Sequence, residues 1–119
     1  MPAVERRHRL SRSRDFDAVY RQGRSVSTRL LTLHWFVRED DPEGGARVGF
    51  AIPRAVGTAV SRNRLKRQLR EVWTEVESHA PPGCDYVLAA RPGLAEPAQE
   101  RGHEWLVEQV REVLGKVTA

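Results

Sequence analysis

The sequence is poor in cysteine and in aromatic residues, and it has no long hydrophobic run. A single cysteine, Cys84, among 119 residues excludes an internal disulfide framework and every multi-cysteine metal site, and it is typical of a reducing compartment. No apolar run approaches the ~20 residues of a membrane span. The arginines at positions 6, 7 and 9 are not followed by the apolar stretch that a signal peptide requires. We therefore expect a cytoplasmic protein that does not bind membranes.

Acidic residues are missing from one long segment of the chain. Residues 47–70 contain seven basic residues and no acid, and residues 1–30 contain eight arginines against three acids. Residues 31–46 and 71–119 carry net charges of −3 and −5, so basic and acidic blocks alternate. Eighteen of the 20 basic residues are arginine, whose planar guanidinium suits bidentate phosphate contacts. This pattern predicts a surface that binds a polyanion; the alternative is a solvated helix face, which usually carries charges of both signs.

The length and the hydrophobic spacing predict one domain of the α+β class, 1–119, with residues 1–10 as a flexible basic tail. The charge pattern above makes it a polyanion-binding domain. The order of elements is α-β-β-α-β-α, a sandwich of helices on a small sheet. The expected helices cover residues 14–22, with Ser13 as the cap, 58–78 and 97–114, and the expected strands cover residues 29–38, 47–52 and 85–90. The turn-rich loop between the first two strands favours a hairpin.

The helix expected at 58–78 has an apolar stripe and a basic face. On a helical projection, Leu65, Leu69 and Val72 lie on the apolar stripe, which faces a core. The outward face carries arginines, one lysine and one amide, with the first arginine at its border: Arg62, Asn63, Arg64, Lys66, Arg67 and Arg70. A phosphate backbone is the natural ligand for such a face.

Two aromatic residues, Phe16 and Tyr20, lie one turn apart in the first expected helix, inside the other basic block. Aromatic side chains among arginines stack on exposed nucleobases, but the same spacing is typical of ordinary core packing. His34, which shares a strand face with Phe36, has the same two interpretations. The spacing alone leaves both open.

The sequence shows no catalytic constellation of its own. The four histidines are scattered, Cys84 has no histidine partner, and acidic residues avoid the basic blocks. A stand-alone nuclease would need an acid cluster beside the basic face. We therefore expect neither catalytic residues nor a metal site in this chain.

The segment 54–71, RAVGTAVSRNRLKRQLRE, closely resembles the signature of the bacterial ribonuclease P protein component. Further matches to that family's pattern occur upstream, so the resemblance covers nearly the whole chain: Arg9-Leu10, Asp15-Phe16, Val19-Tyr20, Gly23, Arg29 and Arg47-Val48-Gly49. The resemblance implies the family's fold, in which two parallel strands are joined through the basic helix in a left-handed connection. Such a connection departs from the right-handed rule that ~98% of cases follow.

The same resemblance implies a function. The chain would be the protein subunit of an endoribonuclease that removes the 5′ leader from precursor tRNA, with the catalytic groups in the RNA subunit. Mg²⁺ would be bound through RNA phosphates, and no protein partner is expected. The alternative is a structural RNA-binding module of the ribosomal-protein type, which needs the basic helix but no leader cleft.

The resemblance also assigns roles to residues of this chain. Contact with the RNA subunit falls to Arg62, Asn63, Arg64, Lys66, Arg67 and Arg70, and contact with the leader falls to Phe16, Tyr20, His34 and Arg54. Two positions depart from the family's pattern. An aromatic residue is usual where His34 stands, and a basic residue is common where Ala55 stands. We expect the second departure to weaken a phosphate contact.

Overall fold

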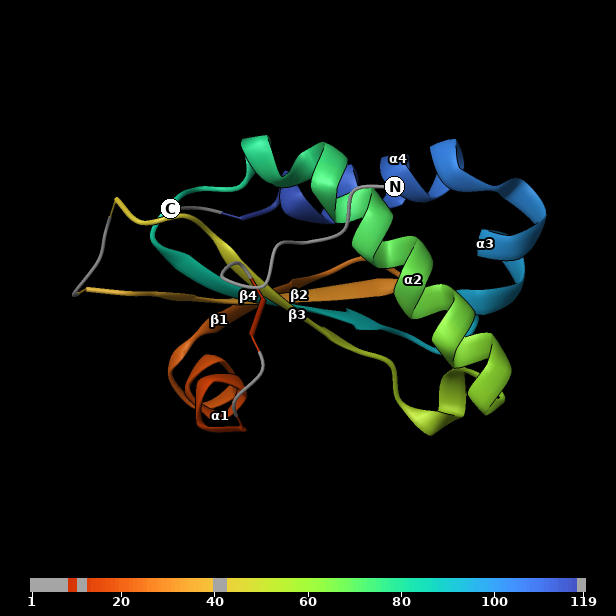
Figure 1. Ribbon diagram of the computed structural model, residues 1–119, viewed down its shortest axis with the longest axis horizontal. Coiled ribbons are helices and arrows are strands. Elements are labelled where there is room, and N and C mark those ends of the chain that lie inside the picture. Colours follow the sequence, from red (N-terminus) through yellow and green to blue (C-terminus); the bar gives the residue numbers. More distant parts are fainter. Residues whose placement is uncertain (1–8, 11–12, 40–42, 118–119) are drawn as a thin grey trace.

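A four-stranded sheet in the order β1-β2-β4-β3 carries helices on both of its faces (Figure 1). The computed structural model describes residues 9–10, 13–39 and 43–117. The strands are β1 (Arg24–Ser27), β2 (Leu31–Val37), β3 (Arg47–Ala51) and β4 (Cys84–Ala90). The helices are α1 (Ser13–Gln22), α2 (Ala59–Val76), α3 (Ala95–Arg101) and α4 (His103–Leu114), with short 3₁₀ turns η2 (Arg54–Val56) and η3 (Glu77–His79).

The strand pairing confirms the α+β class but not the expected hairpin. β2 pairs with β1 and with β4 in antiparallel fashion, and β3 pairs with β4 in parallel. β4 therefore lies between the two strands that were expected to be neighbours. The physical reason is that β4 is apolar on both faces, as a central strand must be. The parallel pair β3 and β4 is joined through α2, as the family resemblance implies; the left-handed sense of that connection stays a prediction.

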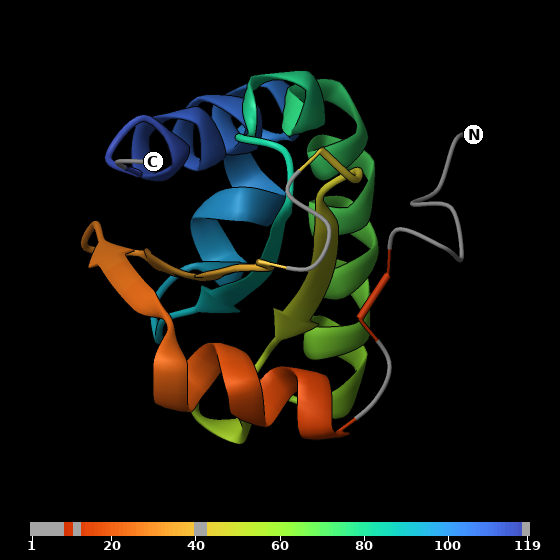
Figure 2. The same cartoon turned by 90° about the vertical axis from the view of Figure 1, so that its left-hand side faces the viewer.

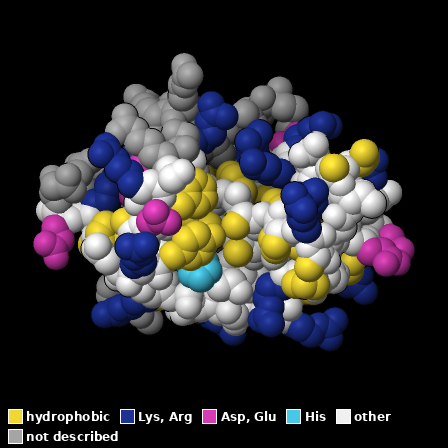
Figure 3. Space-filling view, turned by 90° about the horizontal axis from the view of Figure 1, so that it is seen from below, with side chains coloured by type: hydrophobic (Ala, Val, Ile, Leu, Met, Phe, Trp, Pro, Cys, Tyr) yellow, Lys and Arg dark blue, Asp and Glu magenta, His cyan; other side chains and the backbone are white. Residues whose placement is uncertain are grey.

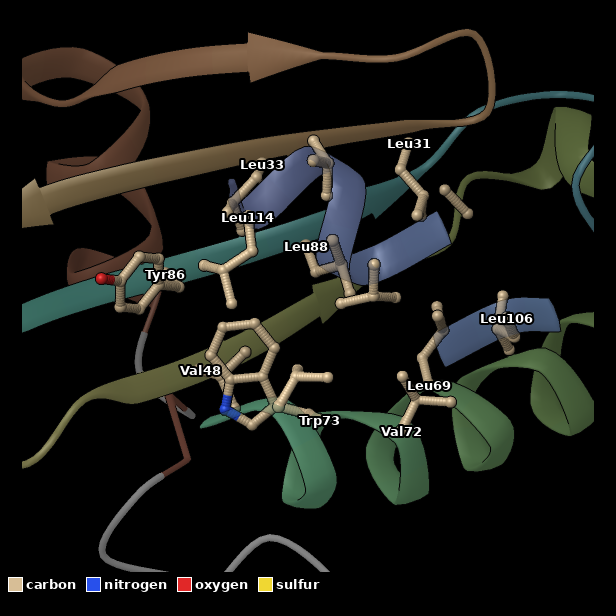
Figure 4. Close-up of a cluster of buried hydrophobic side chains, with 14 of the residues drawn as sticks. Leu31, Leu33, Val48, Leu69, Val72, Trp73, Tyr86, Leu88, Leu106 and Leu114 are labelled. Carbon is tan, nitrogen blue, oxygen red and sulfur yellow. The ribbon is translucent and has the colours of Figure 1, made fainter. Parts of the chain in front are cut away.

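The main core lies between the sheet and the helices α2, α3 and α4. Alternate residues of β2 and β4, including Leu31, Leu33 and Leu88, face this core and are fully buried. They meet the apolar stripe of α2, where Trp73 packs against Tyr86 with ring centroids 5.5 Å apart (Figure 4). The sequence predicted this stripe because helical periodicity is a local signal.

The opposite face of the sheet is covered in part by α1, the one α-helix on that side among the described residues (Figure 2). Val19 of α1 packs against Val87 of β4, and Phe16 lies over Gly49 of β3. A Cβ atom at Gly49 would lie 2.4 Å from the Phe16 ring, so only glycine allows this approach. Phe36 of β2 packs against this second, smaller core, so β2 carries apolar groups on both of its faces.

Several element boundaries differ from the sequence prediction. Strand β1 was not expected, because its four residues, RSVS, are too short and too polar to give a strand pattern. The helix expected at 97–114 is two helices, since Gly102 has a φ of +84°, which an α-helix cannot contain. Ser13 is the first residue of α1 rather than its cap. The last predicted turn of the 58–78 helix is the 3₁₀ turn η3.

The N-terminal residues that the structure describes are not a free tail. Arg9 forms a parallel bridge with Val48, and the Leu10 amide donates to the Val48 carbonyl at 2.9 Å. The Leu10 side chain is buried in the smaller core. Residues 1–8, the rest of the expected tail, lie outside the described residues.

Asp85 is the one charged residue that is buried among those the structure describes, at 3% exposure. Arg38 Nη1 donates to its Oδ1 at 2.7 Å. Arg47 donates from Nε to Oδ1 at 2.7 Å and from Nη2 to Oδ2 at 2.6 Å. Because Asp85 stands opposite Phe36 on one side and Arg47 on the other, these contacts tie β2, β4 and β3 together.

We expect Asp85→Asn to lower the free energy of unfolding by about 3 kcal/mol, because it leaves two guanidinium groups without the buried anion that they share. Urea denaturation followed by tryptophan fluorescence measures this change. The matched control is Asp17→Asn, an exposed acid on α1, which should stay within about 0.5 kcal/mol of the parent chain. A loss no larger than that of the control would show that the two arginines are satisfied without Asp85.

Candidate nucleic-acid interface

The basic face of α2 is the first candidate surface. Thr58 caps the helix, since its Oγ1 accepts from the Ser61 amide at 3.1 Å. The apolar stripe is buried, as expected. The predicted outward residues are exposed or partly exposed: Arg62, Asn63, Arg64, Lys66, Arg67 and Arg70. The structure thus confirms their orientation, while their contact with RNA stays a prediction.

The cations of this face are not neutralised by neighbouring acids. Within the described ranges, none of the basic residues on α2 has a carboxylate within ion-pair distance. Arg62 Nε donates to the Gly57 carbonyl at 3.2 Å, which holds its guanidinium beside the start of the helix. Arg70 Nε is buried and has no hydrogen-bond partner among the described residues. The face, Arg62 to Arg70, therefore presents unpaired positive charge along about two and a half turns of one rigid helix, as a phosphate backbone requires.

The second candidate surface lies on the sheet face that α1 covers only in part. Tyr20 of α1 is 47% exposed, and its ring meets the His34 ring edge to face, with centroids 4.9 Å apart. His34 projects from β2 and is partly buried. Burial lowers the pKa of His34, because the charged imidazolium is less well solvated there. The pair thus offers a neutral aromatic platform with one open side.

Small polar residues continue this surface across the sheet. Ser25 of β1 stands opposite His34, and Ser27 stands opposite Thr32 in the next row. The Ser27 and Thr32 hydroxyls are hydrogen-bonded at 3.0 Å. We call these five residues the open sheet surface: Tyr20, Ser25, Ser27, Thr32 and His34. Figure 3 shows this side of the molecule, where hydrophobic side chains gather beside a histidine and Lys and Arg side chains lie around them.

The four residues that the resemblance assigns to the leader do not form one contact cluster. Tyr20 and His34 touch. Phe16 lies one turn earlier on α1, with its ring over Gly49, so it belongs to the smaller core as well as to the edge of this surface. Arg54 is exposed in η2, beyond the end of β3.

Sequence reasoning missed the serines of this surface, Ser25 and Ser27. Their strand, β1, was not expected, and alternation over RSVS was the only signal available. It also missed a group of three metal-ligating side chains from α2 and α4, namely Glu75, His103 and Glu104, whose ligand atoms lie within 4.8 Å of one another. None of the three belongs to either candidate surface. No helix among the described residues is long and apolar enough to cross a membrane.

We expect the ring of His34 to titrate below its ordinary value of 6.5, because burial disfavours the protonated form. The unfolded chain then binds this proton more readily than the folded chain, so the fold loses stability as the pH falls through this range. Ring-proton NMR measures the midpoint. In Tyr20→Ala the His34 ring is more open to water, and the midpoint should rise toward 6.5. A midpoint at or above 6.5 in the parent chain would contradict this account.

Comparisons with known proteins agree on one family. A family profile described as Ribonuclease P matches residues 4–118. The chain is similar to the ribonuclease P protein component of Bacillus cereus, at 31% identity over 87% of this chain and 89% of the relative. It is also similar to that of Rhodococcus opacus, at 40% identity over 74% of each chain.

Solved structures show the same likeness. The RNase P protein from Thermotoga maritima has a TM-score of 0.81 at 25% identity, over 93% of this chain and 98% of that one. The RNase P protein of Staphylococcus aureus has a TM-score of 0.73 at 26% identity, over 91% of this chain and 93% of that one.

Proposed function

Since this chain belongs to the ribonuclease P protein family and is a protein component of that tRNA-processing ribonucleoprotein, we propose that each of its two candidate surfaces binds a different RNA. The basic face of α2 binds the catalytic RNA subunit. The open sheet surface, with Phe16 at its edge and Arg54 beyond it, holds the 5′ leader of precursor tRNA. The catalytic groups lie in the RNA, and the protein acts by binding and by charge.

The observation that carries this proposal is the unpaired positive charge along α2. Five of the seven basic residues between positions 47 and 70 lie on α2, and that segment contains no acid. The described residues offer these five cations no ion-pair partner. Each phosphate of an RNA duplex that a protein cation neutralises releases a bound counterion, and this release favours binding. A rigid helix, anchored by its apolar stripe on the main core, holds these contacts in a fixed row.

The leader needs a different kind of surface, because it is single-stranded and varies in sequence. Stacking on an aromatic ring stabilises any base by about 1–3 kcal/mol, without reading its hydrogen-bonding edge. Tyr20 and His34 provide such rings, and the exposed Arg54 provides a cation for the leader's phosphates. We therefore expect only modest sequence preference in the leader.

Positive charge on the protein also bears on the metal ions of the reaction. Catalytic RNA and precursor tRNA are both polyanions and repel each other, and Mg²⁺ bound through RNA phosphates offsets part of that repulsion. The cations of α2 supply a further part. The protein should therefore matter most where Mg²⁺ is scarce.

The test is cleavage of precursor tRNA by a bacterial ribonuclease P RNA at low Mg²⁺, with the protein, without it, and with the protein alone. We expect acceleration only when both components are present. Tight binding to structured RNA without any acceleration would favour a ribosomal-type module instead. Cleavage by the protein alone would overturn the assignment of catalysis to the RNA.

The same assay includes Arg67→Ala, which removes one exposed cation of α2. This variant should bind the RNA subunit more weakly and should reduce the magnitude of the salt slope by about 1. Arg111→Ala removes an exposed cation from α4 and serves as the matched control. Equal losses in the two variants would mean that binding follows total charge and not the face of α2.

We expect Tyr20→Ala to weaken binding of the assembled ribonucleoprotein to leader-bearing precursor tRNA by about tenfold, because the variant loses one stacking interaction between an aromatic ring and a leader base. Affinity for mature tRNA, which has no leader, should be unchanged. Val37→Ala, which truncates an exposed apolar residue at the end of β2, is the control. An equal loss for both RNAs would show that Tyr20 supports the fold and does not contact the leader.

A further inference from the structure

We propose that Glu75, His103 and Glu104 form a binding site for a divalent transition-metal ion of the Zn²⁺ class. Glu75 lies near the end of α2, and His103 and Glu104 are the first two residues of α4. The site is separate from both candidate RNA surfaces. It therefore goes beyond the proposed function and does not depend on it.

The fold brings these side chains together from distant parts of the sequence. Gly102, with a φ of +84°, ends α3 and turns the chain so that α4 begins at His103. Helix α4 packs against α2 (Figure 1), and the His103 Nε2 atom contacts the Glu75 carboxylate across this interface. One ligand atom from each of the three residues lies within 4.8 Å of the others.

The local charge favours a cation at this point. The carboxylates of Glu75 and Glu104 lie close to each other, and among the described residues no lysine or arginine pairs with either. Arg101, the basic residue next to them in sequence, lies over the Trp105 ring at 5.7 Å from its centroid instead. A ring nitrogen of His103 lies within 4.8 Å of an oxygen of each of the two carboxylates. A divalent ion between the three would offset the repulsion between two like charges.

The ligand types decide which ion fits. Imidazole nitrogen with carboxylate oxygen is a set that Zn²⁺, Co²⁺ and their neighbours accept, whereas Mg²⁺ prefers oxygen and keeps most of its water. Ligands held ~2.0 Å from a tetrahedral ion lie about 3.3 Å apart, so small side-chain rotations bring these three atoms into place. The side chains of His103 and Glu75 are 37% and 47% exposed, so water can reach the fourth coordination position of a tetrahedral ion.

Such an ion would join the end of α2 to the start of α4. It would bind the folded chain and not the unfolded one, since the ligands come from two helices and Glu75 and His103 lie 28 positions apart in the sequence. Binding would therefore raise the melting temperature in proportion to the logarithm of the free ion concentration.

The test uses the full chain, stripped of metal with a chelator and titrated with ZnCl₂ in a calorimeter. We expect one saturable site per chain that 1 mM MgCl₂ does not block, and a rise in melting temperature on adding Zn²⁺. His103→Gln keeps a hydrogen-bonding group toward Glu75 but removes the imidazole ligand. This variant and Glu104→Gln should each weaken Zn²⁺ binding by at least about tenfold.

His79→Gln is the control, because His79 is exposed in η3 and does not belong to the group of three ligands. It should bind Zn²⁺ as the parent chain does. The absence of a saturable site, or unchanged affinity in His103→Gln with a native circular dichroism spectrum, would overturn the proposal. An equal loss in His79→Gln would place the ion elsewhere and would overturn it as well. RNA takes no part in these measurements, so they stand apart from the test of the proposed function.

Discussion

β4 is buried on both of its faces, and the rest of the fold is placed by that constraint. A strand with apolar residues on both sides needs cover on both sides, and the chain supplies α2, α3 and α4 for one face and α1 for the other. The one carboxylate in β4, that of Asp85, is paired with Arg47 of β3 and with Arg38, which directly follows β2. The parallel pairing of β3 with β4 then fixes where α2 runs and which of its sides faces outward.

The sequence predicted those parts of the fold that local periodicity determines. The spacing of Leu65, Leu69 and Val72 placed the buried side of α2, and hence its basic side, correctly. Strand pairing is not a local property, so the adjacency of residues 29–38 and 47–52 in sequence suggested a hairpin that the buried strand β4 prevents. Strand β1 exists because it pairs with β2, and its four residues carry too little pattern to show that in advance.

In the candidate site, too, local periodicity predicted some features, while others depend on tertiary contacts. Helical geometry predicted that the α2 cations point outward. The roles of Phe16, Tyr20 and His34 came from the family resemblance, because their spacing in the sequence is compatible both with base stacking and with core packing. The structure separates them by environment. Phe16 packs against Gly49 and the smaller core, whereas the Tyr20 ring contacts the His34 ring and is about half exposed to water. The group formed by Glu75 and His103 lay beyond sequence reasoning, since it depends on how α4 packs on α2.

The pairing of Arg9 and Leu10 with Val48 also bears on solubility. β3 is an outer strand of the sheet, and the unpaired amides and carbonyls of such a strand are a template on which a second molecule can add a strand. The bridge between Arg9 and Val48 occupies part of that edge, and the buried Leu10 side chain keeps it in place. Residues 9 and 10 thus leave less of this edge open to pairing with a second molecule.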